Sequence, residues 1–319
     1  MKLLLTGATG QLGHVLSTRL QVYGEVIAPV RKQLDLADGT AITSLIDAVQ
    51  PDLIINAAAY TAVDLAETQV HAAYAINAAA PAILAQQAQR LNIGLIHFST
   101  DYVFDGSGNT PKDEQAEPNP LNVYGLSKLA GEQAIARYCE RHWIFRTSWV
   151  YGTHGGNFLK TILRLAQERD SMNVVADQIG APTSTATIAD VLLHLLENKE
   201  QASSAAIHDH MAATRGIYHL SARGETSWHH YAQTIVKLLS ALQLPHKLQP
   251  GAINAVPSSA YPTAAQRPRN SRLCVDKLEQ CFGVQLPTWE TPVAQCMEQL
   301  TGKQLPAPYD TDIAPAEPT

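Results

Sequence analysis

The sequence has little charge, few cysteines and no long apolar run. Charged residues make up 16% of its 319 residues, and the net charge is −6. A weakly negative chain gives no reason to expect nucleic acid or an anionic membrane as a partner. No apolar stretch approaches the roughly 20 residues of a membrane span. Glycines interrupt the first apolar run too early for a signal peptide.

The cysteines lie far apart and include no Cys-x-x-Cys pair; they are Cys139, Cys274, Cys281 and Cys296. This spacing favours reduced, mostly buried thiols over a disulfide framework or a zinc site. We therefore expect a cytoplasmic protein.

The sequence does contain a glycine-rich turn at its start. Gly7, Gly10 and Gly13 follow an apolar run of strand length and precede an amphipathic stretch. A helix that begins at such a turn directs free N–H groups and the positive end of its dipole towards a phosphate. We expect Gly7 to allow the turn, Gly10 to admit a pyrophosphate, and Gly13 to pack the helix against the strand. A purely structural glycine turn is the alternative.

Strand and helix patterns alternate through the first half of the chain. Strands are expected at 2–6, 25–30, 53–55, 93–99 and 143–146, and helices at 11–22, 38–49 and 64–91 with a break at Pro81. This alternation predicts an α/β fold with a doubly wound, Rossmann-like parallel sheet. Ligands of such sheets bind at the carboxyl ends of the strands.

The alternation weakens after about residue 151. Helices are expected at 158–168, 187–197 and 227–242, short strands at 173–176 and 217–221, and a polar surface loop at 198–215. We expect three parts: a dinucleotide-binding domain over 1–150, an interleaved, smaller α+β substrate part over 151–303, and a disordered tail over 304–319.

Tyr124 and Lys128 stand four residues apart near the start of an expected helix. This spacing places both side chains on one helix face. A nearby ammonium favours phenolate, which would lower the pKa of Tyr124 and make it a usable proton donor. The alternative is a surface pair on an amphipathic helix.

Thr100 and Asp101 follow the strand expected at 93–99. At the end of that strand, the Thr100 hydroxyl can bond a substrate carbonyl or Tyr124, and Asp101 can accept from a sugar hydroxyl. A simple turn or helix cap is the alternative.

Three further segments lie where a dinucleotide would bind. The small residues at 56–61 let the backbone approach a cofactor, with tight packing as the alternative, and Asp35-Leu36 can meet the adenine. The second strand is followed by Arg31-Lys32 instead of an acidic residue, which favours NADPH over NADH. A solvated basic turn is the other interpretation, and NADH stays possible.

Taken together, these residues resemble the extended short-chain dehydrogenase/reductases, and within them the dTDP-4-dehydrorhamnose reductase family. The resemblance covers roughly residues 1–300. It rests on LTGATGQLG near the start, NAAAYTAVD at 56–64, STDYVFDG at 99–106, PLNVYGLSKLAGE at 120–132, RTSWVYG at 146–152, DQIGAPT at 177–183 and RPRNS at 267–271. STDYVF is the most specific of these stretches.

The resemblance implies an NAD(P)H-dependent oxidoreductase that reduces the C4 ketone of dTDP-4-dehydro-6-deoxy-L-mannose to dTDP-L-rhamnose. Tyr124 would be the proton donor, assisted by Lys128 and Thr100. The cofactor would touch Gly10, Gln11, Leu12, Asp35, Leu36, Ala59, Tyr60 and Thr61, and the sugar Thr100, Asp101 and Trp149. Arg267, with Arg269 and Arg272, would approach the diphosphate. Surface charge for the arginines and a core position for Trp149 are the alternatives.

The chain departs from the family at a metal site. Some members bind Mg²⁺ through glutamates at a dimer interface, where this chain has Val15 and Ala186. Neither side chain offers the oxygen ligand that Mg²⁺ needs. We expect no metal, and a monomer or weak homodimer. His208-Asp209-His210 lacks a third ligand nearby in the sequence.

Two other functions stay open at this point. A 4,6-dehydratase or 4-epimerase shares the fold, but dehydratases typically carry Asp-Glu after the Thr, where this chain has Asp101-Tyr102. A non-catalytic regulatory subunit is the second, since the family resembles a eukaryotic protein that binds methionine adenosyltransferase.

Overall fold

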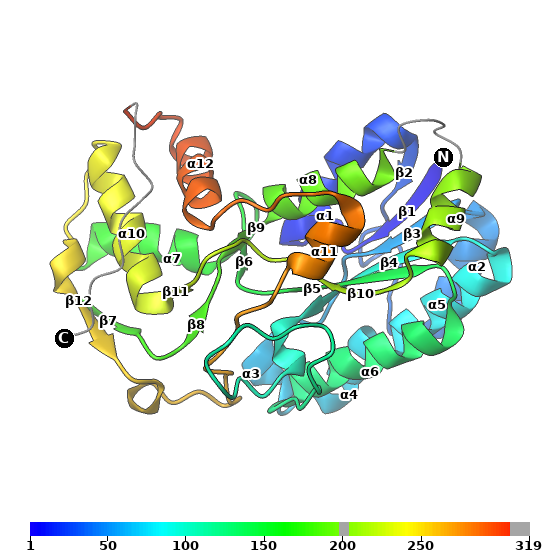
Figure 1. Cartoon of the computed structure of the whole chain (residues 1–319), viewed down its shortest axis with the longest axis horizontal. Coiled ribbons are helices and arrows are strands. Elements are labelled where there is room, and N and C mark those ends of the chain that lie inside the picture. The colour runs from blue at the N-terminus through cyan, green and yellow to red at the C-terminus, as the bar shows by residue number, and fades with distance from the viewer. Residues whose placement is uncertain (198–203, 307–319) are drawn as a thin grey trace.

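A six-stranded parallel sheet forms the centre of the computed structural model, which describes residues 1–197 and 204–306 (Figure 1). The strand order is β2-β1-β3-β4-β5-β10. The bounds are Lys2–Thr6 for β1, Glu25–Ile27 for β2, Leu53–Asn56 for β3, Gly94–Thr100 for β4, His142–Thr147 for β5 and Gly216–His219 for β10. The order reverses direction between β1 and β3, which marks the ligand-binding crevice of such sheets. The predicted doubly wound α/β fold is confirmed.

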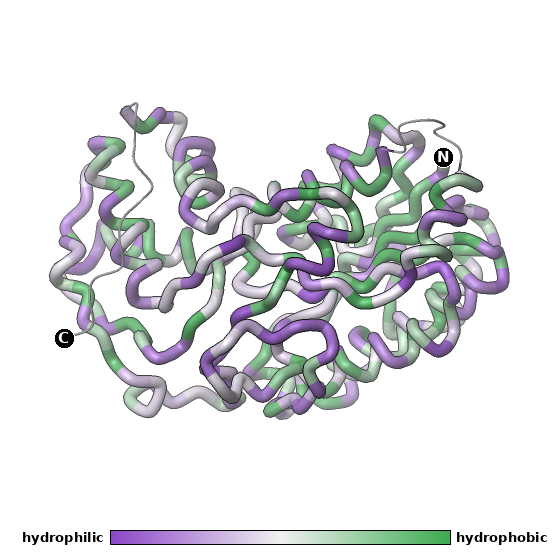
Figure 2. Tube along the Cα trace, viewed as in Figure 1, coloured by the Kyte–Doolittle hydropathy of each residue, from purple (hydrophilic) through white to green (hydrophobic). Residues whose placement is uncertain are grey.

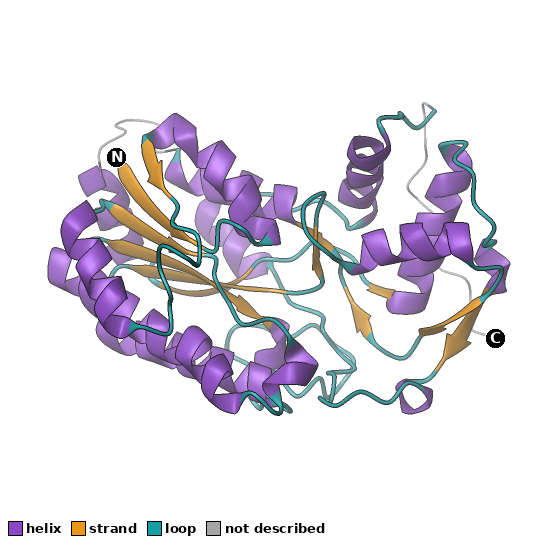
Figure 3. Ribbon diagram, turned by 180° about the vertical axis from the view of Figure 1, so that it is seen from behind, coloured by secondary structure: helices purple, strands orange, loops and turns teal. Residues whose placement is uncertain are grey.

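Helices cover both faces of the sheet (Figure 3). Alternate side chains of each strand explain this, because Leu3 and Leu5 belong to one apolar cluster and Leu4 to another. The cluster of Leu4 includes side chains from α2 (Gly39–Val49), α5 (Ala80–Leu91) and α6 (Val123–Tyr138). The cluster of Leu3 includes side chains from α1 (Gln11–Arg19), α8 (Thr185–Leu196), α9 (Ser204–Ala213) and α11 (Asp276–Phe282). Hydrophobic residues are concentrated in the strands between these layers (Figure 2).

The segment expected to form one long helix over 64–91 is divided. It contains α3 (Val63–Ala66), α4 (Val70–Tyr74), a π-helical turn (Ala75–Ala79) and α5. The helical backbone continues from Val70 to Leu91, and Pro81 lies directly after the π-helical turn, where the helix changes type. A π-helical turn often marks a functional site.

A second group of elements lies beside the sheet (Figures 1 and 3). Its helices are α7 (Phe158–Glu168), α10 (Trp228–Ala241) and α12 (Glu290–Thr301). Its strands form three short pairs: β6 (Val150–Tyr151) with β9 (Thr183–Ser184), β7 (Met172–Val175) with β12 (Ile253–Val256), and β8 (Ile179–Gly180) with β11 (Thr226–Ser227). These elements share an apolar cluster of their own, which includes Leu159, Tyr231, Ile235, Trp289 and Met297.

Two expectations from the sequence are wrong here. The strand expected at 217–221 is β10, which pairs with β5 in the main sheet and not with the smaller part. The loop expected at 198–215 contains α9, whose Ile207 and Met211 are buried against the sheet. Both errors have one cause: tertiary packing overrides a weak local pattern.

Two expected segments lie partly or mostly outside the residues that the structure describes. Residues 198–203 of the expected loop and 307–319 of the expected tail lie outside the described residues. Leu305 packs against the second apolar cluster. In residues 1–197 and 204–306, no helix is both long enough and apolar enough to cross a membrane.

Candidate active site

The glycine turn connects β1 to α1 and packs against the segment that follows β3. Gly7 has a φ of +78°, and a Cβ there would come within 2.7 Å of the backbone of Ala57 and Ala58. A Cβ at Gly13 would lie 2.1 Å from the carbonyl oxygen of Gly7. The turn, the first helix and the segment after β3 therefore approach each other more closely than any larger residue would allow.

The N-terminus of α1 is open for an anion. Gly10 is the N-cap residue, and no side chain caps the helix there. The N–H of Gly10 is occupied because it donates to Gly7 O at 2.9 Å. Gln11 and Leu12, in the first turn, are half-buried, and Gln11 Oε1 accepts from Asn157 Nδ2 at 2.9 Å. The backbone N–H groups in the first turn of α1 are therefore the donors that would suit the pyrophosphate of a dinucleotide.

The loop after β3 carries Ala59, Tyr60 and Thr61. Asn77, in the π-helical turn, accepts from the N–H of Tyr60 at 2.8 Å and donates to its carbonyl at 3.1 Å. Asn77 Nδ2 also donates to Ser127 Oγ at 3.0 Å. Asn77 therefore joins the loop to α6. The sequence reasoning missed Asn77, and its only signal was an amide in an Ala-rich segment.

The segment after β2 carries the remaining cofactor candidates. Arg31 and Asp35 are exposed, and Leu36 is half-buried. Asp35 Oδ1 accepts from the N–H of Ala37 at 3.0 Å. Because β2 pairs in parallel with β1, this segment starts at the same edge of the sheet as the glycine turn.

Tyr124 and Thr100 lie together at the carboxyl end of β4. Asn122 caps α6 by accepting from the N–H of Gly125 at 2.8 Å, which places Tyr124 in the first turn. The hydroxyl of Thr100 lies close enough to the Tyr124 hydroxyl to lower its pKa. The ring edge of Tyr102 meets Tyr124 with a centroid distance of 5.5 Å. The structure thus brings the predicted proton donor and the predicted hydroxyl into contact.

Burial raises the pKa of Tyr124 to about 12, although the nearby Thr100 hydroxyl lowers it. Lys128 points instead to β4, where its Nζ donates to Phe98 O at 2.6 Å and lies 3.1 Å from His97 Nε2. The prediction that Lys128 lowers the pKa of Tyr124 is therefore wrong for this arrangement, because Lys128 is directed away to the strand. Burial lowers the pKa of Lys128 to about 8.

Asp101 is a buried carboxylate with an unpaired oxygen. Its Oδ1 accepts from Thr100 Oγ1 at 3.2 Å, and Oδ2 has no hydrogen-bond partner among the described residues. Burial raises its pKa to about 6, while the hydroxyls of Ser271 and Thr100 lower it. A buried acceptor of this kind is suited to a ligand hydroxyl.

Trp149 adopts a strained backbone conformation near Asp101. Its φ is +48°, which is rare for a bulky residue and typical of functional sites. Its ring stacks on Trp228 with a centroid distance of 3.6 Å. A Cβ at Gly180 would lie 2.8 Å from the Trp149 ring and 3.1 Å from Ser271 Cβ. Trp149 and Asp101 therefore lie on one side of the site, and sequence reasoning missed Trp228 and Ser271.

Arg267 forms an ion pair with Asp64. Its Nη2 donates to Asp64 Oδ2 at 2.6 Å, and its Nη1 donates to Ala265 O at 2.9 Å. Its positive charge opposes the rise in the pKa of Tyr102 that burial causes. Arg267 thus lies close to Tyr102, on the side of the site that Tyr102 and Tyr124 share.

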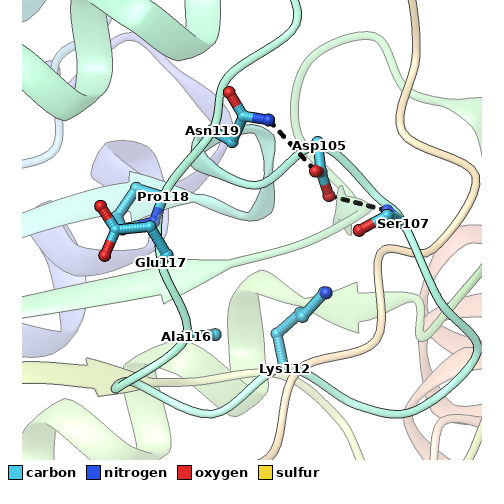
Figure 4. A pocket seen from close by; sticks show the side chains of 7 residues that line it. All are labelled: Asp105, Ser107, Lys112, Ala116, Glu117, Pro118 and Asn119. Carbon is cyan, nitrogen blue, oxygen red and sulfur yellow. Dashed lines mark hydrogen bonds between the residues drawn. The ribbon is translucent and has the colours of Figure 1, made fainter.

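A separate pocket opens in the loop that follows β4 (Figure 4). Asp105 lies on one side of it and accepts from Ser107 N at 2.8 Å and from Asn119 Nδ2 at 3.2 Å. None of the predicted site residues lines this pocket; its lining consists of Asp105, Ser107, Lys112, Ala116, Glu117, Pro118 and Asn119.

The two positions at which the family's metal ligands were expected lie on α1 and α8. Val15 is half-buried and Ala186 is exposed. In the part of the chain that the structure describes, no three His, Cys, Asp or Glu side chains gather in a way that could hold a metal ion. His208 instead contacts Asp52 O through its Nε2, at 2.6 Å.

Comparison with known proteins gives one consistent result. The family model described as RmlD substrate binding domain matches residues 1–301. The dTDP-4-dehydrorhamnose reductase of Burkholderia thailandensis is 42% identical over 300 residues, which cover 94% of this chain and 99% of the relative. The enzyme of the same name from Escherichia coli K12 is 41% identical, covering 94% of this chain and 98% of the relative.

Solved structures agree with the sequence relatives. The dTDP-4-dehydrorhamnose reductase of Bacillus anthracis, in complex with NADP, has a TM-score of 0.82 and 33% identity, covering 93% of this chain and 99% of that one. The Clostridium acetobutylicum reductase has a TM-score of 0.84 and 33% identity, covering 94% and 100%. The chain therefore belongs to the RmlD substrate binding domain family.

Proposed function

We propose that this chain reduces the C4 ketone of dTDP-4-dehydro-6-deoxy-L-mannose to dTDP-L-rhamnose. Curated relatives at about 40% identity carry the name of this activity, and their alignment extends over most of both chains. The observation that carries the proposal is the contact between Tyr124 and Thr100 at the carboxyl edge of the sheet.

The cofactor that fits the glycine turn is NADPH, which when bound supplies the hydride for C4. Gly7, Gly10 and Gly13 would form its pyrophosphate site, with Gln11 and Leu12 on the first turn of α1. Asp35, Leu36, Ala59, Tyr60 and Thr61 would line the remainder. A relative of known structure was solved in complex with NADP. The exposed Arg31 would hold the 2′-phosphate of the cofactor.

Tyr124 is the proton donor of the proposed reaction. A phenol is protonated at neutral pH because its ordinary pKa is about 10, and burial raises the pKa of Tyr124 further. The C4 oxygen is a base strong enough to take this proton once it becomes an alkoxide. The proton then passes from Tyr124 to that oxygen. Thr100 would hold the phenol in place. Its one hydroxyl proton is donated to Asp101 Oδ1, so Thr100 would donate to the ketone oxygen only after turning away from Asp101.

The sugar nucleotide would bind between the sheet and the second group of elements. Asp101 has an unpaired oxygen that can accept from a sugar hydroxyl. The Trp149 ring can pack against the sugar. Arg267 would approach the diphosphate after exchanging part of its pairing with Asp64. In this proposal residues 1–150 supply the cofactor site together with Asp101 and Trp149, and residues 151–303 supply Arg267 and the Trp228 ring that stacks on Trp149.

We further propose that the enzyme acts in the cytoplasm as a monomer or weak homodimer, without Mg²⁺. The four cysteines are free, as expected of a reducing compartment. Val15 and Ala186 offer no oxygen ligands for a shared ion. Sedimentation with and without EDTA tests whether the oligomeric state depends on a metal ion. A dimer that EDTA dissociates would contradict the proposal of an enzyme without Mg²⁺.

One assay separates the reductase from the two other functions. The 4-dehydro-6-deoxy sugar nucleotide is made in situ, this protein is added, and NADPH absorbance is followed together with the nucleotide sugar formed. A reductase oxidises NADPH in proportion to product. A dehydratase or epimerase converts a 4-hydroxy nucleotide sugar without net NADPH use, and a regulatory subunit does neither.

Cofactor preference has its own test. We expect a lower KM for NADPH than for NADH, and Arg31→Ala should raise the KM for NADPH about tenfold while changing that for NADH little. The Lys247→Ala variant, altered far from β2 in the sequence, serves as the control for a general loss of positive charge. If the ratio of the KM values for NADPH and NADH stayed unchanged in Arg31→Ala, Arg31 would not be the residue that favours NADPH.

A further inference from the structure

A chain of buried polar side chains leads from the core to Lys128. Thr6 Oγ1 donates to Asn56 Oδ1 at 2.6 Å, and Asn56 Nδ2 lies 2.9 Å from His97 Nδ1. His97 Nε2 in turn lies 3.1 Å from Lys128 Nζ. All four residues are buried, and they connect β1, β3, β4 and α6. Of these four residues, only Lys128 has an expected part in the reaction, as a residue that assists Tyr124.

The direction of the hydrogen bonds follows from one backbone group. The N–H of Ala58 donates to Asn56 Oδ1 at 3.3 Å, and a backbone N–H can only donate. The amide oxygen of Asn56 must therefore face Ala58, which leaves its NH₂ group facing His97. Asn56 Nδ2 then donates to His97 Nδ1, so that Nδ1 carries no proton.

The state of Lys128 follows from the state of His97. A neutral imidazole without a proton on Nδ1 carries its proton on Nε2. That N–H points at Lys128 Nζ and needs a lone pair as acceptor. An ammonium has three donors and no lone pair, whereas a neutral amine has one. In this arrangement Lys128 is therefore a neutral amine, which still donates to Phe98 O at 2.6 Å.

The surroundings of Lys128 permit the neutral amine at alkaline pH. Burial is the main influence and lowers the pKa of Lys128 to about 8, while Glu132 on the same helix raises it. Glu132 is itself neutralised by Arg146 of β5. Burial also holds the pKa of His97 well below its usual range, and Lys128 in its charged form would lower it further. Three further titratable groups lie near the start of α6: Tyr124 on the helix itself, Asp101 close to Tyr124, and Glu67, which accepts from the N–H of Val123.

We propose that His97 is a positioning residue that holds Lys128 inward as a neutral amine at alkaline pH, and that Lys128 gains a proton and leaves His97 when the cofactor binds. The second half rests on the function proposed above, because the cofactor ribose would be the new partner of Lys128. The proton comes from solvent. Proton uptake therefore accompanies cofactor binding above about pH 8.

The test of the first half needs no activity. In the full chain without cofactor, ¹⁵N NMR at pH 9 shows which nitrogen of His97 carries the proton. ¹³C NMR of labelled lysine gives the titration midpoint of Lys128, assigned by its loss in Lys128→Met. We expect the proton on Nε2 and a midpoint about two pH units below the ~10.4 of ordinary lysines. A proton on Nδ1, or a midpoint among the other lysines, overturns the proposal.

Asn56→Asp provides the matched variant, since it replaces one NH₂ group by an oxygen. The carboxylate still accepts from Ala58 and now also accepts from His97 Nδ1–H. His97 Nε2 becomes an acceptor that suits an ammonium. We expect the imidazole proton to move to Nδ1 and the Lys128 midpoint to rise by at least one pH unit. A folded variant that keeps its proton on Nε2 contradicts the proposed hydrogen-bond direction.

Calorimetry tests the second half. NADPH binding at pH 9, measured in two buffers of different ionisation enthalpy, should take up a large fraction of one proton, and Lys128→Met should take up none. Absence of uptake in the unaltered enzyme overturns the switch of Lys128. An inactive protein with the expected NMR result would instead remove the proposed function and leave the state of Lys128 standing.

Discussion

Arg146 and Glu132 form an ion pair in the interior of the molecule. Arg146 Nη2 lies 2.6 Å from Glu132 Oε2, and Arg146 Nε donates to Glu132 Oε1 at 3.0 Å. The side chains are 2% and 1% exposed. Glu132 lies one helical turn beyond Lys128, so the pair fixes the helix that carries Tyr124 and Lys128 to β5 of the sheet.

Glu132→Ala should therefore destabilise the fold strongly. It leaves the Arg146 guanidinium buried without its carboxylate, which typically costs about 3–5 kcal/mol. Urea unfolding measures this free energy. Glu168→Ala is the control, since its pair with Arg164 is exposed and should contribute less than about 0.5 kcal/mol. Equal effects of the two substitutions would show that the buried pair has no special role.

Asp101→Asn should stabilise the protein and weaken catalysis. The folded pKa of about 6 lies above the ~3.9 of an unfolded Asp, so the folded state binds more protons between these values. Above pH 6 the ionised carboxylate therefore destabilises the fold, and this penalty disappears as the pH falls to about 4. We expect a gain of about 1–3 kcal/mol at pH 7.5, which shrinks below pH 6.

Activity provides the second readout for Asp101. In the unaltered enzyme the KM for the sugar nucleotide should rise as the pH falls through 6, because protonation removes an acceptor. Asp101→Asn should raise that KM about tenfold and abolish its pH dependence near 6. A variant that is less stable at pH 7.5, or that keeps the pH dependence, refutes this account of Asp101.

Gly13→Ala should abolish cofactor binding or prevent folding. Its Cβ would lie 2.1 Å from Gly7 O, so the helix must move away from the glycine turn. Gly251→Ala is the matched control, because nothing lies within 4 Å of a Cβ there. Fluorescence titration with NADPH and thermal unfolding distinguish the two. Tight NADPH binding by Gly13→Ala would contradict the close packing described here.

Gly180→Ala should affect the sugar nucleotide and not the cofactor. The added Cβ would meet the Trp149 ring at 2.8 Å and displace it from its stack on Trp228. We expect the KM for the sugar nucleotide to rise about tenfold, with the Kd for NADPH unchanged within about twofold. If only NADPH affinity changed, Trp149 would belong to the cofactor site instead.

The fold was predictable from the sequence where the local pattern was strong. The strands next to the glycine turn are continuous apolar runs, and the helix Phe158–Glu168 has periodic apolar residues; both have clear boundaries. The place of β10 was not predictable, since four residues do not specify which sheet they join. The sequence did not predict the helix α9, because this Ala- and His-rich segment has only two buried apolar residues, Ile207 and Met211, and they give a weak helical pattern.

The site was predictable only where spacing constrains geometry. Tyr124 and Lys128 are four apart on one helix, and Thr100 ends the strand beside it, so their proximity follows from helix and sheet geometry. The partners of these residues come from distant segments. His97, Asn77 and Ser271 are brought in by tertiary packing, and no local pattern indicated them. The direction of Lys128 likewise depends on a strand it does not belong to.

The most direct measurement is the turnover of Tyr124→Phe with the 4-dehydro-6-deoxy sugar nucleotide and NADPH. Loss of the phenolic proton should lower kcat about 10²–10⁴-fold, while thermal stability and the Kd for NADPH stay close to those of the unaltered enzyme. A Tyr124→Phe enzyme that binds NADPH and turns over at the unaltered rate would contradict the assignment of Tyr124 as the proton donor.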